Sequence, residues 1–136
     1  MSPARRFSLI ALTLTVVGGA LLLPARRAAA DRTAEARQLI KLLVKRDYAG
    51  VEKTFDGAMK QALPAAKLKA TWEGVVAQAG AFKTQGAARS QVVQQGGQSY
   101  QAVTITCQFA NAAVDAKVVY NGQGQVSGLF FSPAGQ

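Results

Sequence analysis

The feature that most constrains the fold of this chain is a change in hydrophobic period at Gly80. Before Gly80, apolar residues recur at steps of three and four, as one face of a helix requires. After Gly80 they recur at every second position, as one face of a strand requires. Helices followed by strands, without interleaving, predict an α+β fold in which the helices cover one face of the sheet.

The first half of the mature chain predicts three or four helices. An amphipathic helix is expected from Thr33 to Arg46, followed by a turn at 47–50. A helical face then continues to Leu63 and is divided by Gly57. The last helix begins at Pro64 and ends at Gly80. The apolar positions of these segments are Ala36, Leu39, Ile40, Leu43, Val51, Phe55, Met59, Leu68, Trp72, Val75, Val76 and Ala79.

The second half predicts an antiparallel meander of four strands. Their expected ranges are 82–94, 100–109, 114–120 and 126–132, and Gly86 to Ala88 indicates a bulge in the first. The glycine-rich segments 96–97 and 121–124 are typical of hairpin turns. The predicted architecture is therefore a set of N-terminal helices packed on a curved, four-stranded antiparallel sheet.

Residues 1–30 have the pattern of an export signal. Arg5 and Arg6 precede an uncharged apolar run at 7–23, and three alanines end at Ala30. Cleavage is expected between Ala30 and Asp31, which leaves residues 31–136 as a single secreted or periplasmic domain. The alternative is an uncleaved membrane anchor formed by residues 7–23, because that run is at the lower limit for spanning a bilayer.

Composition excludes several classes of protein and of site. Cys107 is the single cysteine, so no intramolecular disulfide can form. The sequence holds no histidine, which removes His-based acid–base pairs, Ser-His-Asp and Cys-His nucleophiles and the usual zinc sites. The net charge of the chain is +9, and it falls to +5 without the four leader arginines. A basic excess of this size does not indicate a nucleic-acid partner. No cofactor is expected.

Several residues together resemble a known family. They are Asp47-Tyr48, Phe55-Asp56, Met59, Leu63-Pro64, Leu68, Trp72, Gly80, Phe82, Cys107-x-Phe109 and Val126-x-Gly128-Leu129-x-Phe131. They are similar to a family of uncharacterised bacterial exported domains, some found ahead of α/β-hydrolase domains, that is itself similar to the nuclear-transport-factor-2-like superfamily. The resemblance implies a cone-like fold that can leave a cavity at its open end, and it implies no activity. If this domain acts as an accessory to a hydrolase, the hydrolase would be a separate chain.

If such a cavity exists, aromatic and apolar residues are its expected lining. The candidates are Tyr48, Phe55, Met59, Trp72, Phe109 and Phe131. For Trp72 and Cys107, packing in the core is the favoured interpretation.

Aspartate and tyrosine are the residues left for an isomerase-like or lyase-like enzyme. The aspartates are Asp47, Asp56 and Asp115, and the tyrosines are Tyr48, Tyr100 and Tyr120. Asp56 is expected to cap a helix, Asp47 to lie in a turn and Asp115 to be solvated.

The leading hypothesis is a non-catalytic exported module that binds a small apolar ligand or a protein. Its proposed surfaces are the open end of the cone and the outer face of the sheet. A homodimer through the sheet is a further expectation, since Tyr100, Val119, Leu129 and Phe131 are apolar side chains that one layer of helices need not cover. A third hypothesis is a basic helical surface for anionic envelope polymers, formed by Arg37, Lys41, Lys45, Arg46, Lys53 and Lys60.

Overall fold

The computed structural model describes the backbone of residues 23–135 and the side chains of residues 32–135. Residues 31–136 form one compact unit, which holds the whole of the sheet. The apolar run 7–23 lies almost wholly outside the described residues, so the signal peptide and the alternative anchor stay predictions. Within the described part, no helix is long and apolar enough to cross a membrane.

Four helices come first in the described chain: α2 (Leu23–Val44), α3 (Tyr48–Glu52), α4 (Gly57–Ala62) and α5 (Ala65–Ala79). Helix α2 begins ten residues before the predicted start at Thr33. Alanine favours helix formation, and a proline is tolerated in a first turn, so residues 24–30 extend it. The turn predicted at 47–50 is wrong at residues 48–50, because those residues begin α3. Asp47 caps that helix by accepting a hydrogen bond from Gly50 N at 3.0 Å.

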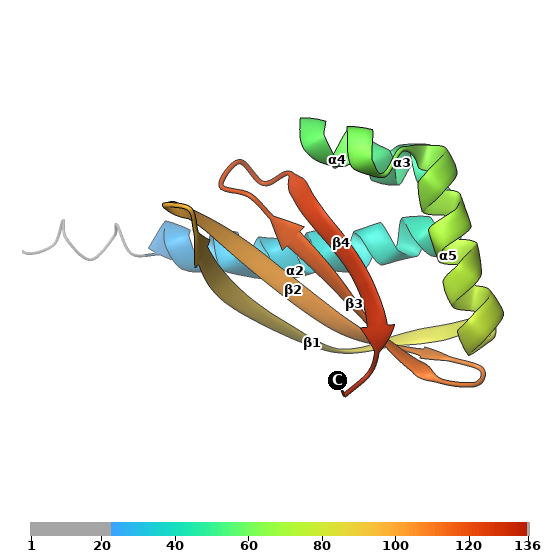
Figure 1. Ribbon diagram of the computed structural model, residues 1–136. Coiled ribbons are helices and arrows are strands. Elements are labelled where there is room, and N and C mark those ends of the chain that lie inside the picture. The colour runs from blue at the N-terminus through green and yellow to red at the C-terminus, as the bar shows by residue number, and fades with distance from the viewer. Residues whose placement is uncertain (1–22, 136) are drawn as a thin grey trace, which may run out of the picture. The chain divides into compact units, whose positions relative to one another are not determined.

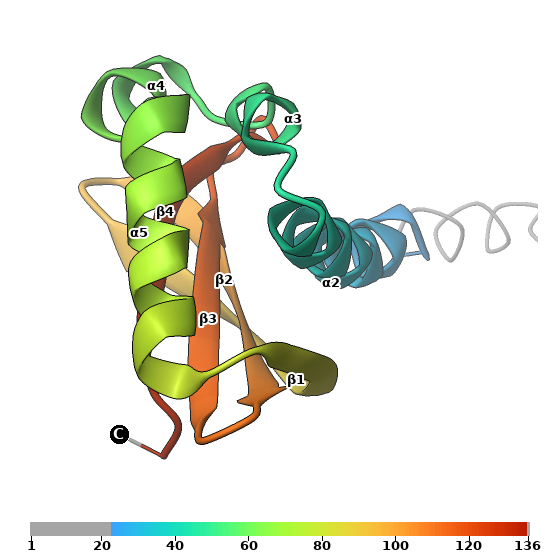
Figure 2. The same cartoon turned by 90° about the vertical axis from the view of Figure 1, so that its right-hand side faces the viewer.

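Four strands follow and confirm the α+β prediction: β1 (Phe82–Gln95), β2 (Gln98–Phe109), β3 (Ala113–Tyr120) and β4 (Val126–Pro133). They form one antiparallel sheet in sequence order, as Figure 1 shows. The bulge predicted in the first strand is confirmed by a register shift between Gln85 and Ala88. Helix α2 passes behind the strands in this view, and α5 crosses one end of the sheet (Figures 1 and 2).

The sheet has two unlike faces. The covered face looks toward the helices and carries most of the core. Its buried side chains are Val103, Ile105, Cys107, Phe109, Ala116, Val118, Tyr120, Val126 and Leu129. The opposite face, here called the helix-free face, is defined by register as Arg89, Gln91, Val93, Tyr100, Ala102, Thr104, Thr106, Asp115, Lys117, Val119, Gly128, Phe130 and Ser132.

The bulge in β1 is tied to α2 by one arginine. Arg37 Nη2 donates to the Gly86 carbonyl at 3.1 Å, and the Gln85 amide donates to the Arg37 carbonyl at 3.0 Å. A Cβ on Gly86 would lie 2.9 Å from the Thr106 carbonyl, so glycine is required at this close approach. Arg37 therefore joins helix to sheet, and it does not belong to a free basic stripe with Lys41 and Lys45.

The β4 edge of the sheet is occupied at its first residue. Phe55 forms a parallel bridge with Val126, whose amide donates to the Thr54 carbonyl at 2.8 Å and whose carbonyl accepts from Asp56 N at 2.9 Å. The linker between α3 and α4 is thus hydrogen-bonded to the sheet and closes this part of its edge.

Candidate functional site

Three of the expected pocket residues meet in an aromatic cluster at the end of the sheet that α5 crosses. The Trp72 ring lies 5.8 Å from the rings of both Phe109 and Phe131, and Phe82 completes the cluster at 6.4 Å from Trp72. Trp72 is 4% exposed and Phe109 is 5% exposed. These two side chains lie in the core, which confirms the favoured interpretation of Trp72.

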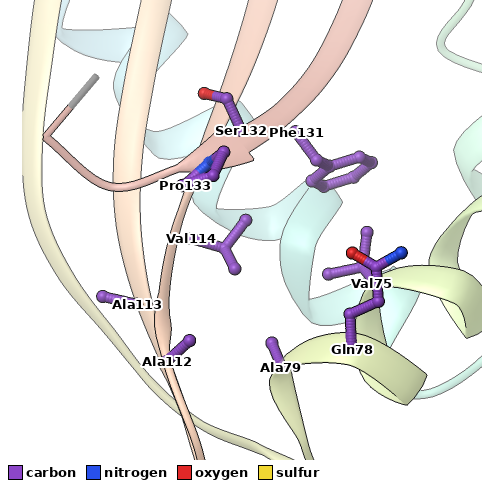
Figure 3. A pocket seen from close by; sticks show the side chains of 9 residues that line it. All are labelled: Val75, Gln78, Ala79, Ala112, Ala113, Val114, Phe131, Ser132 and Pro133. Carbon is purple, nitrogen blue, oxygen red and sulfur yellow. The ribbon is translucent and has the colours of Figure 1, made fainter.

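A hollow of about 230 Å³ opens beside this cluster, between α5 and the paired strands β3 and β4 (Figure 3). Phe131 borders it, and Gln78 and Ser132 are the lining residues with polar side chains. The other lining residues are Val75, Ala79, Ala112, Ala113, Val114 and Pro133. Its volume is below the roughly 300 Å³ at which ligand pockets usually begin.

The remaining expected pocket residues are separated from that hollow. Phe55 is 1% exposed on the linker before α4, and Met59 is 9% exposed on α4. Tyr48 is the first residue of α3, and its buried hydroxyl has no hydrogen-bond partner among the described residues. None of the three borders the hollow beside Phe131.

Each aspartate considered for catalysis makes structural hydrogen bonds. Asp56 caps α4 by accepting from Met59 N at 2.8 Å, which confirms the capping interpretation. The prediction that Asp115 is solvated is wrong, because this residue is 6% exposed. Its carboxylate accepts from Thr106 Oγ1 at 2.6 Å and pairs with Arg89 Nη2 at 3.5 Å. Thr106 lies directly opposite on β2, and Arg89 reaches across from β1.

Cys107 is a core thiol, as the alternating pattern of β2 predicts. It is 3% exposed, and its Sγ donates weakly to the Ile105 carbonyl at 3.7 Å. Burial, and secondarily the negative charge of Asp115, raises the pKa of this thiol to about 11. A thiol that keeps its proton in this way is a poor nucleophile. The described residues also contain no cluster of three or more histidine, cysteine or acidic side chains able to hold a metal.

A larger hollow lies on the helix-free face. A groove of about 600 Å³ runs across it between the β1–β2 turn and β4. Phe130 is 57% exposed here. The groove is lined by Val93, Gln95, Gly96, Gln98, Tyr100, Ala102, Lys117, Val119, Ser127, Gly128 and Phe130.

The expectation that Leu129 and Phe131 are left uncovered by the helices is wrong. Leu129 is 9% exposed on the covered face, and Phe131 packs against the core on that same face. Phe130, between them, is the aromatic residue exposed to solvent. The strict alternation of Leu129, Phe130 and Phe131 is the signal that could have identified it.

Comparison with known proteins gives a family and a fold. Residues 36–129 match a family model described as a protein of unknown function, DUF3887. No curated protein matches the chain. An NMR structure of a protein from Ruminococcus gnavus ATCC 29149 superposes with a TM-score of 0.60 at 14% identity, over 76% of this chain and 88% of that one. At this identity the likeness shows the fold alone.

Proposed function

The chain belongs to the DUF3887 family, and we propose that it is an exported, non-catalytic binding module for a partner protein. The docking surface is the groove on the helix-free face, and the occupant is an acidic segment that also carries apolar side chains. The single observation that carries this proposal is the exposed Phe130 within a groove of about 600 Å³ that no described helix covers.

The apolar part of the groove is suited to protein contacts. Phe130, Tyr100 and Val119 border it together with the aliphatic side chain of Val93. Exposed aromatic side chains next to apolar surface are the residues that most often anchor protein partners. Solvation of a half-exposed phenylalanine is unfavourable, so covering it would stabilise a complex.

The charge of this face selects an acidic occupant. By register, the acidic and basic residues on this face are Arg89, Asp115 and Lys117. Asp115 is buried and already paired with Arg89, which leaves Lys117 in the groove lining without an ion-pair partner among the described residues. Charge complementarity therefore favours a partner that brings carboxylates.

The shape of the groove favours a protein over a small molecule. Small-molecule sites usually enclose most of the ligand surface. This groove lies on an open sheet face, where a small ligand would remain largely in water. A second copy of the chain is also disfavoured, because each helix-free face carries the unpaired charge of Lys117, and the carboxylate of Asp115 is already paired with Arg89.

A peptide-display selection on the purified protein tests the proposal. We expect enrichment of peptides that combine aspartate or glutamate with aromatic or aliphatic residues, and binding that weakens as salt rises. Phe130→Ala should lower the affinity about tenfold, as removal of an interface anchor does. Lys117→Glu should weaken binding to the acidic peptides and leave the unfolding free energy nearly unchanged.

Val92→Ala is the matched control, since Val92 is also exposed, at 66%, but does not border the groove. Its binding should equal that of the wild type. Selection of peptides without acidic residues, or equal losses for Val92→Ala and Phe130→Ala, would contradict the proposal. A concentration-dependent dimer abolished by Phe130→Ala would replace the acidic partner with a second copy.

A further inference from the structure

A third hollow lies on the covered side of the sheet, where α2 approaches the β3–β4 connection. Its volume is about 340 Å³. Helix α2, the α3–α4 linker and the β3–β4 connection each contribute to its wall. The lining residues are Glu35, Gln38, Leu39, Leu42, Lys53, Thr54, Tyr120, Gly124 and Gln125.

Tyr120 is the unusual residue of this hollow. Its side chain is 2% exposed and its hydroxyl forms no hydrogen bond with another described residue, but that oxygen is open to solvent, unlike the buried and unpaired hydroxyl of Tyr48. The phenol therefore has an unused donor at a site with room for a ligand.

The phenol remains a donor at any ordinary pH. Burial raises the pKa of Tyr120 well above its usual range, and the nearby Glu35 carboxylate raises it further. The Arg32 guanidinium lies 5.8 Å from the centroid of the Tyr120 ring, a cation–π arrangement that holds the ring in place.

The charges around the hollow favour an anion. Glu35 is already paired with Arg32, whose Nη1 lies 2.9 Å from Glu35 Oε1. Lys53 has no ion-pair partner among the described residues, and the Thr54 hydroxyl donates to the Val51 carbonyl at 2.7 Å. Among the charged and hydroxyl groups of the lining, those left to bind a ligand are thus the Tyr120 hydroxyl and the Lys53 ammonium, both of them donors, beside the side-chain amides of Gln38 and Gln125.

The opposite wall of the hollow is apolar. Leu39 and Leu42 project from α2 at a spacing of three residues and both border it. A ligand that satisfies the donors and this wall has one anionic acceptor group and a hydrocarbon body. We propose that the hollow binds a small monocarboxylate, which accepts a hydrogen bond from Tyr120, pairs with Lys53 and packs its apolar body on Leu39 and Leu42.

Hexanoate is a suitable probe, with uncharged hexanamide as its matched control. In two-dimensional NMR spectra of the purified, isotope-labelled protein, millimolar hexanoate should shift amide signals of Gln38, Thr54 and Gln125. Hexanamide should bind at least several-fold more weakly because it lacks the charge. The absence of hexanoate shifts, or shifts confined to the groove around Lys117, would overturn the proposal.

Tyr120→Phe separates binding from structure. It should lower hexanoate affinity about tenfold, since it removes a hydrogen bond to a charged group. The midpoint of urea unfolding should not fall, because the hydroxyl has no protein partner to lose. Tyr100→Phe is the control: its hydroxyl lies 3.1 Å from Gln98 Oε1 on the helix-free face, and its loss should leave hexanoate affinity unchanged. Equal affinity in Tyr120→Phe and the wild type would refute the assigned role.

Lys53→Gln tests the ionic contribution. It should reduce the difference in affinity between hexanoate and hexanamide, whereas Lys60→Gln, on the exposed surface of α4, should not. An unchanged difference in Lys53→Gln would remove the lysine from the site.

Discussion

The two faces of the same sheet differ in what holds their side chains. On the covered face, aromatic and aliphatic side chains pack against helices, among them α5 with Trp72, which is 4% exposed. On the helix-free face, a buried carboxylate is held by Thr106 and Arg89, and Phe130 is left 57% exposed. The covered face therefore supplies stability, and the helix-free face has apolar surface available for binding.

Truncation of one aromatic residue on each side tests this difference most strongly. Trp72→Ala should lower the free energy of unfolding by about 3–5 kcal/mol, because it leaves a cavity beside Phe109 and Phe131. Phe130→Ala should change it by less than about 0.5 kcal/mol, since most of that ring is already in water. Urea denaturation followed by circular dichroism measures both, and similar losses would show that the faces are not distinct.

Asp115 tests whether the helix-free face has a structural polar network of its own. Asp115→Ala should lower the unfolding free energy by roughly 1–3 kcal/mol, because the Thr106 hydroxyl loses its partner at 2.6 Å. In the double variant with Thr106→Val the loss should be smaller than the sum of the two single losses. Strict additivity in this cycle would contradict direct coupling.

Cys107 makes the stability of the covered face depend on pH, and its effect is seen only in alkaline solution. Its folded pKa is raised from 9.0 to about 11, so the unfolded chain releases this proton first as pH rises. Stability from this group is complete below pH 9 and is lost as pH rises toward 11, by up to roughly 3 kcal/mol. The difference in unfolding free energy between wild type and Cys107→Ala should shrink across that range. A difference independent of pH would show that the thiol is not desolvated.

The order of helices and strands could be predicted from the sequence, because burial imposes a period that each element repeats. The bulge near Gly86 and the cap at Asp56 could also be predicted, since both depend on local backbone chemistry. The burial of Asp115 could not, because its partner Arg89 lies on β1 and the bulge sets which residue of β1 lies there.

The groove on the helix-free face and the hollow at Tyr120 could not be predicted for a related reason. The groove on the helix-free face depends on which strand positions stay uncovered, and the hollow at Tyr120 depends on how α2 crosses the β3–β4 connection. Both depend on the placement of whole elements. Lys53 was therefore visible in the sequence only as one member of a basic helical surface, and Lys117 only as an ordinary lysine.

The bridge between Phe55 and Val126 makes the two edges of the sheet unequivalent. A strand added beside β4 would meet residues 54–56 at Val126 and could pair only beyond that residue, whereas no described strand pairs with the outer side of β1. Two copies joined through β1 would thus carry a partly covered edge at each end of the enlarged sheet. The bridge shortens the edge that a further strand could use and so hinders fibre growth.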